Sequence, residues 1–221
     1  MTERIIEAYV GEYASGKSEN AVNRAIALSR QGLPVTLVDL DTVEPCYTMR
    51  PIKRELEAMG IAVEAWETSD TIGLGETGNV IKGSMRWVLR RPGNIILDIG
   101  YGVQGAKVFN LIEGASENRW LTIIAVINLS RPFTANVNDI VDYVRSLGRV
   151  DGLLNNTHLA EETTVTLVQK GALVVKDAAD RLNVPMVATA VLQNIAEQIG
   201  SRDCTGAPVR KLERVMTKAF W

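Results

Sequence analysis

The stretch VGEYASGKSENAV, residues 10–22, decides the fold expected of this 221-residue chain. Between Gly11 and Ser18 it holds the spacing Gly-x-x-x-x-Gly-Lys-Ser, which is typical of a loop that wraps around phosphate groups. The apolar run at residues 5–10 predicts a strand before this loop, and residues 17–30 have the period of a helix after it. In such a unit, backbone N–H groups and the positive end of the helix point at a bound anion. The stretch therefore predicts a nucleotide-binding loop.

Nine consecutive residues make up the predicted nucleotide-binding segment: Gly11, Glu12, Tyr13, Ala14, Ser15, Gly16, Lys17, Ser18 and Glu19. We expect Lys17 to reach the β- and γ-phosphates and to act in catalysis, and we expect the Ser18 hydroxyl to bind Mg²⁺. A glycine- and serine-containing turn that only caps a helix is the alternative. The position of the loop directly after a strand favours the phosphate site.

Apolar, β-branched runs alternate with longer segments of helical period along the rest of the chain. Further strands are predicted at residues 35–40, 61–65, 94–100, 121–129, 151–157 and 185–191, and further helices at 49–59, 79–90, 135–147 and 164–182. Strands that are apolar throughout and separated by helices indicate a parallel sheet buried on both faces. We therefore predict one α/β domain, residues 1–221, of the P-loop nucleoside-triphosphatase class. Its sheet is doubly wound and mostly parallel, with about seven strands and helices on both faces.

Acidic residues follow two of the predicted strands. Asp39 and Asp41 lie at the end of the second strand, and Asp98 ends a later one. Because ligands of such folds sit beyond the carboxyl ends of the strands, these carboxylates are candidates for holding Mg²⁺ or orienting water. We assign Ser18, Asp39 and Asp98 to the metal, and we expect Gly102 to let the backbone approach the γ-phosphate.

Base selection is predicted from the amides that end a late strand. Asn155 and Asn156 lie in the segment LLNNT, where an amide can pair with the N6/N7 edge of adenine. A guanine-selective site normally supplies an aspartate, and the segment NNTHL contains none. The sequence therefore favours ATP over GTP, because polar contacts of this kind set base discrimination.

Composition excludes several other classes of protein. The chain has 24 Lys plus Arg against 26 Asp plus Glu, so no basic field indicates binding to nucleic acid. Its single histidine does not suit a zinc site. Charges interrupt the apolar N-terminal run, which is unlike a signal peptide, and no apolar run is long enough to span a membrane. We expect a cytoplasmic protein.

Four motifs together resemble those of the MinD/ParA-type ATPases, a group that also contains CooC-like nickel-insertion ATPases and dethiobiotin synthetase. They are GEYASGKS at 11–18, DLD at 39–41, LDIGYG at 97–102 and NNT at 155–157. The resemblance implies binding of ATP or ADP with Mg²⁺ and slow hydrolysis, with Asp41 as the catalytic residue that orients the attacking water. It also implies a face-to-face homodimer or another protein partner in the nucleotide-bound state.

One position departs from the family pattern. Where MinD/ParA-like proteins typically carry a lysine that reaches the phosphates of the other subunit, this chain has Glu12. A carboxylate pointing inward repels the phosphate charge, so we expect Glu12 to face outward. Tyr13 and Ala14 also replace glycines of the family, which predicts a stiffer loop.

The segment APVRKLERVMTKAFW near the C-terminus predicts an amphipathic helix at about residues 208–221. Its apolar stripe favours packing on the sheet. Contact with an anionic membrane through its basic residues is the less favoured alternative.

Three functions remain open at this point. The first is an ATP-driven switch, a slow ATPase that changes its contact with a partner protein or cargo. The second is an ATP-dependent small-molecule kinase or ligase of the dethiobiotin-synthetase type, with Arg50, Lys53, Arg90 and Arg91 as contacts for an anionic substrate. The third is a membrane-associated nucleotide-binding regulator that uses the C-terminal segment.

Overall fold

The computed structural model describes residues 4–41, 49–66 and 81–216. Its centre is a sheet of eight parallel strands in the order β3-β2-β4-β1-β5-β6-β7-β8. The strands are β1 (Ile6–Gly11), β2 (Val35–Leu40), β3 (Ile61–Glu64), β4 (Asn94–Ile99), β5 (Leu121–Ile127), β6 (Gly152–Asn155), β7 (Met186–Leu192) and β8 (Val209–Leu212). The predicted α/β fold with a parallel sheet is confirmed, and the sheet has one strand more than the seven expected.

Helices connect the strands and cover both faces of the sheet. The α-helices are α1 (Lys17–Arg30), α2 (Lys53–Ala58), α4 (Gly83–Arg86), α5 (Gly102–Ala106), α6 (Val137–Leu147), α7 (Val165–Leu182) and α8 (Gln193–Ile199). Short 3-10 helices are η2 (Arg50–Ile52), η3 (Val88–Arg90), η4 (Lys107–Leu111), η5 (Pro132–Thr134) and η6 (Ala160–Glu162). The long helices α1, α6 and α7 match the predicted segments, whereas α5 and α8, of five and seven residues, were not predicted.

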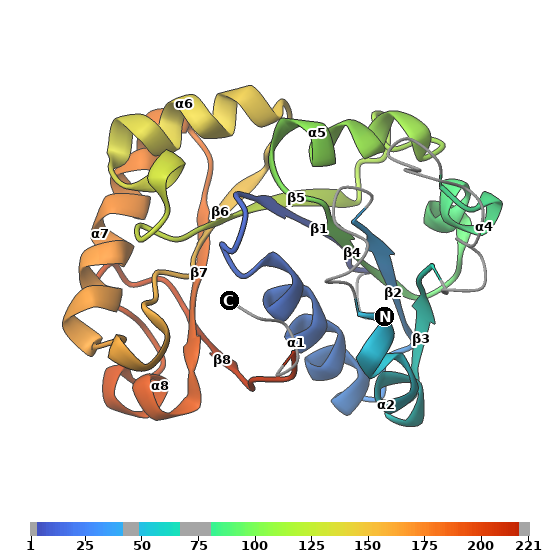
Figure 1. The fold of residues 1–221 in the computed structure, drawn as a ribbon, viewed down its shortest axis with the longest axis horizontal. Helices are drawn as coiled ribbons and strands as arrows, with labels where there is room; N and C mark the ends of the chain where they lie inside the picture. Colours follow the sequence, from blue (N-terminus) through green and yellow to red (C-terminus); the bar gives the residue numbers. More distant parts are fainter. Residues whose placement is uncertain (1–3, 42–48, 67–80, 217–221) are drawn as a thin grey trace.

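The two faces of the sheet bury separate cores. On one face, α1 and α2 pack on the sheet through residues such as Val22, Ala25 and Leu56. On the other face, α6 and α7 pack through residues such as Ile140 and Val175. Figure 1 shows this division, with α5 and α6 on one side of the sheet and α1 and α2 on the opposite side. All six residues of β1, β2 and β4 are buried, including polar residues such as Glu7 and Asp98, as expected of a sheet covered on both faces.

The C-terminal segment corrects one prediction. Residues Val209–Leu212 form the parallel edge strand β8 against β7, where the sequence pattern had predicted a helix. Arg210 donates to the Tyr9 hydroxyl at 3.2 Å, and Tyr9 donates to Glu7 at 2.8 Å, so buried polar groups in β1 hold this strand in place. Such tertiary contacts override a helical pattern. Residues 213–216 of the predicted helix are not helical either, and residues 217–221 lie outside the described part.

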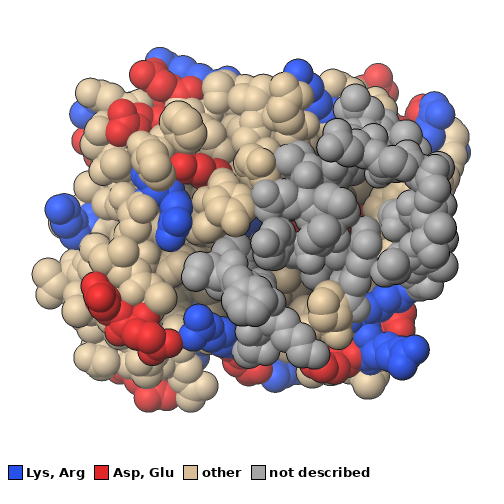
Figure 2. Space-filling model, viewed as in Figure 1, with Lys and Arg blue, Asp and Glu red and all other residues tan. Residues whose placement is uncertain are grey.

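Charge is dispersed over the molecule. Figure 2 shows basic and acidic side chains interspersed over the face in view, with no broad field of one sign. Within residues 4–41, 49–66 and 81–216, no helix has the length and apolar character needed to span a membrane.

A close backbone contact positions the end of β4. A Cβ atom on Gly105, in α5, would lie 1.9 Å from the carbonyl oxygen of Gly100, just beyond β4. Only a glycine allows α5 to pack this tightly after Asp98. The helix therefore fixes the course of the chain where it leaves the sheet.

We expect Gly105→Ala to lower the free energy of unfolding by about 2–3 kcal/mol, because the new methyl group meets backbone atoms that have no flexible end to move. Urea denaturation measures this change. Gly83→Ala in α4 is the matched control, since no atom lies within 4 Å of its added Cβ. Equal stability of the two variants would contradict the packing argument.

Candidate functional site

The phosphate loop lies at the point where the order of the strands reverses, between β4 and β5. Strand β1 pairs with β4 on one side and with β5 on the other, and its loop leads into α1. In open α/β sheets, ligands bind outside the carboxyl ends of the strands at such a switch point. The predicted nucleotide-binding segment therefore occupies the position that this fold reserves for a ligand.

The loop backbone adopts conformations that curl it into a cradle. Gly16 has φ 91° and serves as the N-cap of α1, and Ala14 has φ 52°, a left-handed conformation that is strained for a residue with a side chain. The Lys17 ammonium group donates to the carbonyl oxygen of Glu12 at 3.1 Å and is buried. The buried Ser15 hydroxyl has no hydrogen-bond partner among the described residues. A buried cation and an unsatisfied hydroxyl beside a helix N-terminus are suited to an anion.

Asn156 braces this loop from the end of β6. Its side-chain amide donates to the carbonyl oxygen of Ser15 at 2.8 Å. A Cβ atom on Gly16 would lie 2.1 Å from the same amide nitrogen, so the contact depends on glycine. Asn156 thus links the phosphate loop to the end of β6.

Two carboxylates lie side by side at the ends of neighbouring strands. Asp39 in β2 and Asp98 in β4 are register partners, and both are buried. Burial, together with the charge of Asp39, raises the pKa of Asp98 to about 8, although a hydrogen bond from Ser18 and the charge of Lys17 oppose this shift. One oxygen of Asp98 has no hydrogen-bond partner among the described residues. A bound cation would favour the ionised form of both carboxylates.

The residues present fit Mg²⁺. The Ser18 hydroxyl and the Asp39 and Asp98 carboxylates are hard oxygen ligands, and a divalent cation would satisfy the orphaned oxygen of Asp98. Within the described ranges, no group of three or more His, Cys, Asp or Glu side chains is arranged to hold a metal. This agrees with Mg²⁺ sites that use only one or two carboxylates and complete their coordination with water and phosphate oxygens.

Asp39 also organises the segment that follows β2. Its two oxygens accept from the backbone N–H of Asp41 at 3.1 Å and of Met49 at 3.2 Å. Asp41 is half-buried, and its charge acts on Asp98. The structure thus brings Asp41 to the acidic pair, and its role in orienting water stays a prediction.

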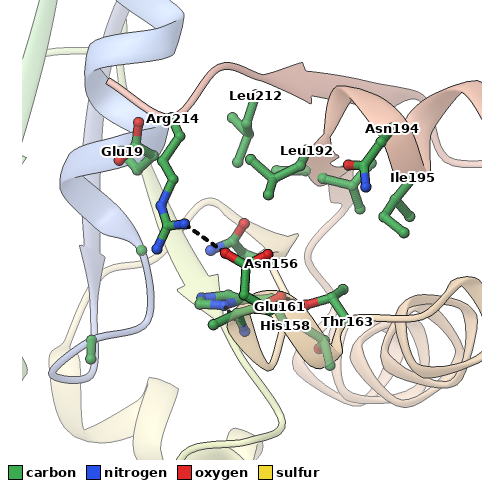
Figure 3. Close-up of a pocket in the computed structure, with 16 residues that line it drawn as sticks. Glu19, Asn156, His158, Glu161, Thr163, Leu192, Asn194, Ile195, Leu212 and Arg214 are labelled. Carbon is green, nitrogen blue, oxygen red and sulfur yellow. Dashed lines mark hydrogen bonds and ion pairs between the residues drawn. The ribbon is translucent and has the colours of Figure 1, made fainter. Parts of the chain in front are cut away.

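A hollow of about 140 Å³ opens beside the phosphate loop, on the side where Asn156 lies. Figure 3 shows Asn156, His158, Asn194, Leu192 and Leu212 around it. It is smaller than a complete small-molecule site, which is consistent with one ring system of a ligand whose phosphates lie in the loop. Its wall is apolar on the β7 side, through residues such as Val191 and Ile195.

The C-terminal segment closes one wall of this hollow. Arg214 pairs with Glu161 at 3.0 Å, as the dashed line in Figure 3 shows. Glu19, expected to contact nucleotide, instead accepts from the backbone N–H groups of Val215 at 2.6 Å and Met216 at 3.3 Å. Burial raises the pKa of Glu19, and these hydrogen bonds oppose the shift. Glu19 lines the hollow while holding the C-terminal segment on α1.

Asn155 does not reach the hollow. It is fully buried, and its amide donates to the Val168 carbonyl at 3.2 Å and to the Thr189 hydroxyl at 3.1 Å. Its oxygen accepts from the backbone N–H of Thr157 at 3.1 Å. The structure therefore gives Asn155 a role in joining β6, α7 and β7, and only Asn156 lines the hollow.

Glu12, expected to face outward from the phosphates, points away from the hollow that Asn156 lines but is buried. Glu12 is only 7% exposed, and its carboxylate accepts from the backbone N–H of Phe133 at 3.4 Å and from the Thr134 hydroxyl at 3.3 Å. It turns toward η5, away from the hollow that Asn156 lines. Tyr13 and Gly102 lie on this same side of the loop. The rings of Tyr13 and Tyr101 meet edge to face there, with centroids 5.4 Å apart.

Several residues of the hollow had no signal in the sequence. Leu192 ends β7, Asn194 lies in α8, and Arg214 belongs to a segment whose pattern had predicted a helix. Each is separated from the phosphate loop by more than 170 positions, so only the topology brings them together.

Solved structures share this fold. The signal recognition particle receptor FtsY from Elizabethkingia anophelis has a TM-score of 0.55 at 14% identity, covering 88% of this chain and 61% of its own. FtsY from Thermotoga maritima has a TM-score of 0.57 at 15% identity, covering 87% and 63%. FlhF complexed with GTP/Mg²⁺ has a TM-score of 0.56 at 14% identity, covering 88% and 68%.

These similarities establish the P-loop NTPase fold. The chain spans about three-fifths of the length of the FtsY chains that it matches. No family model matches the sequence, and no curated protein matches it.

We expect Asp98→Asn to stabilise the protein and to abolish the effect of Mg²⁺ on nucleotide binding. The folded pKa of Asp98 lies above its ordinary value of 3.8, so folded wild type retains a proton that the unfolded chain releases between about pH 4 and pH 8. Wild-type stability therefore falls relative to the variant as pH rises through this window. The melting temperature of the variant should exceed that of wild type by roughly 5 °C at pH 8 and by less at pH 4.

Differential scanning calorimetry at the two pH values measures this difference. Glu117→Gln, at an exposed acid far from the sheet end, is the control and should show no gain that depends on pH. An Asp98 variant less stable than wild type at both pH values would contradict the raised pKa.

Replacing the two neighbouring asparagines separates their roles. Asn155→Ala removes three buried hydrogen bonds and should cost about 1–3 kcal/mol of stability while leaving nucleotide affinity unchanged. Asn156→Ala should weaken nucleotide binding about tenfold, because it frees the loop carbonyl. Denaturation and fluorescent-nucleotide titration of both variants test the assignment, and reversed effects would overturn it.

Proposed function

We propose that this protein binds a nucleoside triphosphate with Mg²⁺, hydrolyses it slowly and uses the change to switch its contact with a protein partner. The observation that carries the proposal is the convergence of the phosphate loop and the buried Asp39–Asp98 pair at one edge of the sheet. Lys17 and Ser18 come from the loop and act electrostatically on Asp98. A cationic side chain, a hydroxyl and two acids around a helix N-terminus suit a triphosphate with its metal.

Each residue has a defined task in this proposal. Lys17 exchanges its contact with the Glu12 carbonyl for phosphate oxygens, and the N–H groups at the start of α1 bind the same anion. Ser18, Asp39 and Asp98 hold Mg²⁺, which when bound offsets the charge of the phosphates. Asp98 must lose its proton for this, and Asp41 orients the attacking water.

For the base we propose adenine. A guanine-selective site requires a carboxylate that accepts from the ring, and the two acids nearest the hollow are engaged elsewhere. Glu19 binds the backbone of residues 215 and 216, and Glu161 pairs with Arg214. The Asn156 amide and the apolar wall suit adenine. Guanine is the competing candidate, because solved structures of similar fold were determined with GDP or with GTP and Mg²⁺.

The switch function rests on the MinD/ParA-like motifs and on the chain beyond Asp98. Gly102 has φ 66° and begins α5, so the segment between Asp98 and α5 is placed to follow the state of the acidic pair. FtsY and FlhF share the fold at low identity and leave the choice of partner open. We place the protein in the cytoplasm, acting as a homodimer or with another protein, and not through a membrane-bound C-terminal helix, since residues 209–212 form β8.

The kinase or ligase alternative loses two of its basic contacts. The guanidinium carbon of Arg90 lies 4.1 Å from the centroid of the Trp87 ring, and Arg91 forms an ion pair with Glu64. Both precede β4, so they lie near its amino end, at the edge of the sheet opposite the phosphate loop. Lys53 begins α2 and lies 4.0 Å from Glu57, and the side chain of Arg50 is outside the described part.

Two substitutions test the proposed roles. Lys17→Ala should weaken ATP binding at least tenfold, because it removes charge-assisted hydrogen bonds to phosphate. Asp41→Ala should leave binding within about twofold of wild type and reduce turnover. Calorimetric titration and phosphate release measure the two effects. Unchanged ATP binding in the Lys17 variant would refute the site, whereas persistent turnover in the Asp41 variant would refute only that role.

Base choice and switching are measured on the wild type. Titration with ATP and GTP in the presence of Mg²⁺ should show tighter binding of ATP, and tighter binding of GTP would replace adenine by guanine. Light scattering with Mg²⁺ and a non-hydrolysable ATP analogue, and again with Mg-ADP, compares the mass in the two states. A dimer with the analogue alone supports the switch.

A further inference from the structure

A second pocket, of about 580 Å³, lies on the Glu12 side of the phosphate loop. It is walled by the loop, the start of α5, η5 and α6, and it lies opposite the hollow that Asn156 lines. In Figure 1, α5 and α6 run along the same side of the sheet, where these walls meet. Its volume falls within the range of small-molecule sites.

Aromatic rings form the body of this pocket. Phe133 and Tyr143 are stacked, with ring centroids 6.3 Å apart, and Tyr13 meets Tyr101 edge to face. Phe133 is 66% exposed and Tyr13 is 45% exposed, which is unusual for rings in a folded domain. A set of partly exposed rings offers π faces to a ligand.

The charged groups of the pocket all have one sign. Glu12, Asp139 and Asp142 line it, and no lysine or arginine does so within the described ranges. Asp139 accepts a hydrogen bond from Asn136, and Asp142 is exposed. Aromatic faces beside carboxylates attract cations in particular.

Buried polar groups at the base of the pocket are incompletely stabilised. Burial raises the pKa of Glu12, and its hydrogen bonds with Phe133 and Thr134 and the charges of Arg131 and Lys17 oppose that shift. The buried Tyr143 hydroxyl forms no well-aligned hydrogen bond within the described chain, although it lies close to the backbone of Gly102. Burial and the charge of Glu12 raise the pKa of Tyr143, so this buried hydroxyl stays neutral.

We propose that this pocket binds a small organic cation, an amine or guanidine on an apolar or aromatic body. The exposed rings of Phe133 and Tyr13 contact the body, and the carboxylates of Asp139 and Asp142 attract the positive group. The site is separate from the nucleotide hollow and shares with it only the phosphate loop. Binding here contacts Glu12, the residue whose carbonyl holds Lys17.

The test uses tyramine as the probe and its neutral analogue 2-(4-hydroxyphenyl)ethanol as the control, because the two differ only in the ammonium group. Two-dimensional ¹H–¹⁵N NMR titration of wild type should give saturable shifts at Phe133 and Tyr143 with tyramine. The neutral analogue should bind about three- to tenfold more weakly.

Two variants and one control locate the site. Asp142→Asn and Phe133→Ala should each weaken tyramine binding about threefold and leave nucleotide affinity unchanged, whereas Glu117→Gln, at an exposed acid outside the pocket, should change neither. Phe133→Ala should also fold normally, since the Phe133 ring is 66% exposed.

Several results would overturn the proposal. These are equal affinity for the two probes, no saturable shift, shifts outside the pocket, and shifts of the pocket amides with protein concentration alone, which would assign this face to a second copy of the chain. Lys17→Ala keeps the test independent of the nucleotide site, because it should retain tyramine binding even where nucleotide binding is lost.

Discussion

Two carboxylates forced together at neighbouring strand ends are the constraint on which this site depends. The parallel register of β2 and β4 places Asp39 and Asp98 directly beside each other. The packing of α5 on Gly100 fixes the chain just beyond Asp98. Ionising both acids in a buried place is unfavourable, so the free protein retains a proton there. A bound cation removes that cost, which links the chemistry of the site to the stability of the whole sheet.

The phosphate loop separates two environments of different character. On one side, Asn156 and the apolar end of β7 form a narrow hollow without a free carboxylate among its described walls. On the other side, Glu12 turns into a wider pocket of rings and acids. One short loop thus touches both, and Lys17 is tied to the Glu12 carbonyl between them. A ligand on either side acts on the same few backbone atoms.

The fold could be predicted because the strands buried on both faces are predominantly apolar and α1, α6 and α7 have a clear helical period. Local pattern failed where tertiary contacts decide. Val209 and Leu212 are three positions apart, a spacing typical of a helix, yet contacts with Tyr9 and β7 make residues 209–212 a strand. The burial of Glu12 was not predicted, because nothing local indicates that Phe133 and Thr134, more than 120 positions later, donate hydrogen bonds to it. Asn155 and Asn156 are equivalent in the sequence pattern, and only the contacts in the structure show that one joins β6 to α7 and β7 while the other contacts the phosphate loop.

The hydrogen bonds between α1 and residues 213–216 set the order in which the walls of the hollow come together during synthesis. Asn23 exchanges two hydrogen bonds with the backbone of Glu213, and Glu19 accepts from the backbone of Val215 and Met216, across some 190 positions of chain. Strands β1 to β7 and the phosphate loop precede this segment in the chain, so they are synthesised before it. Leu212 and Arg214, which form one wall of the hollow beside Asn156, join it only afterwards. A ligand that contacts this wall therefore stabilises the docked state of the segment, and it can do so only after the segment has been synthesised.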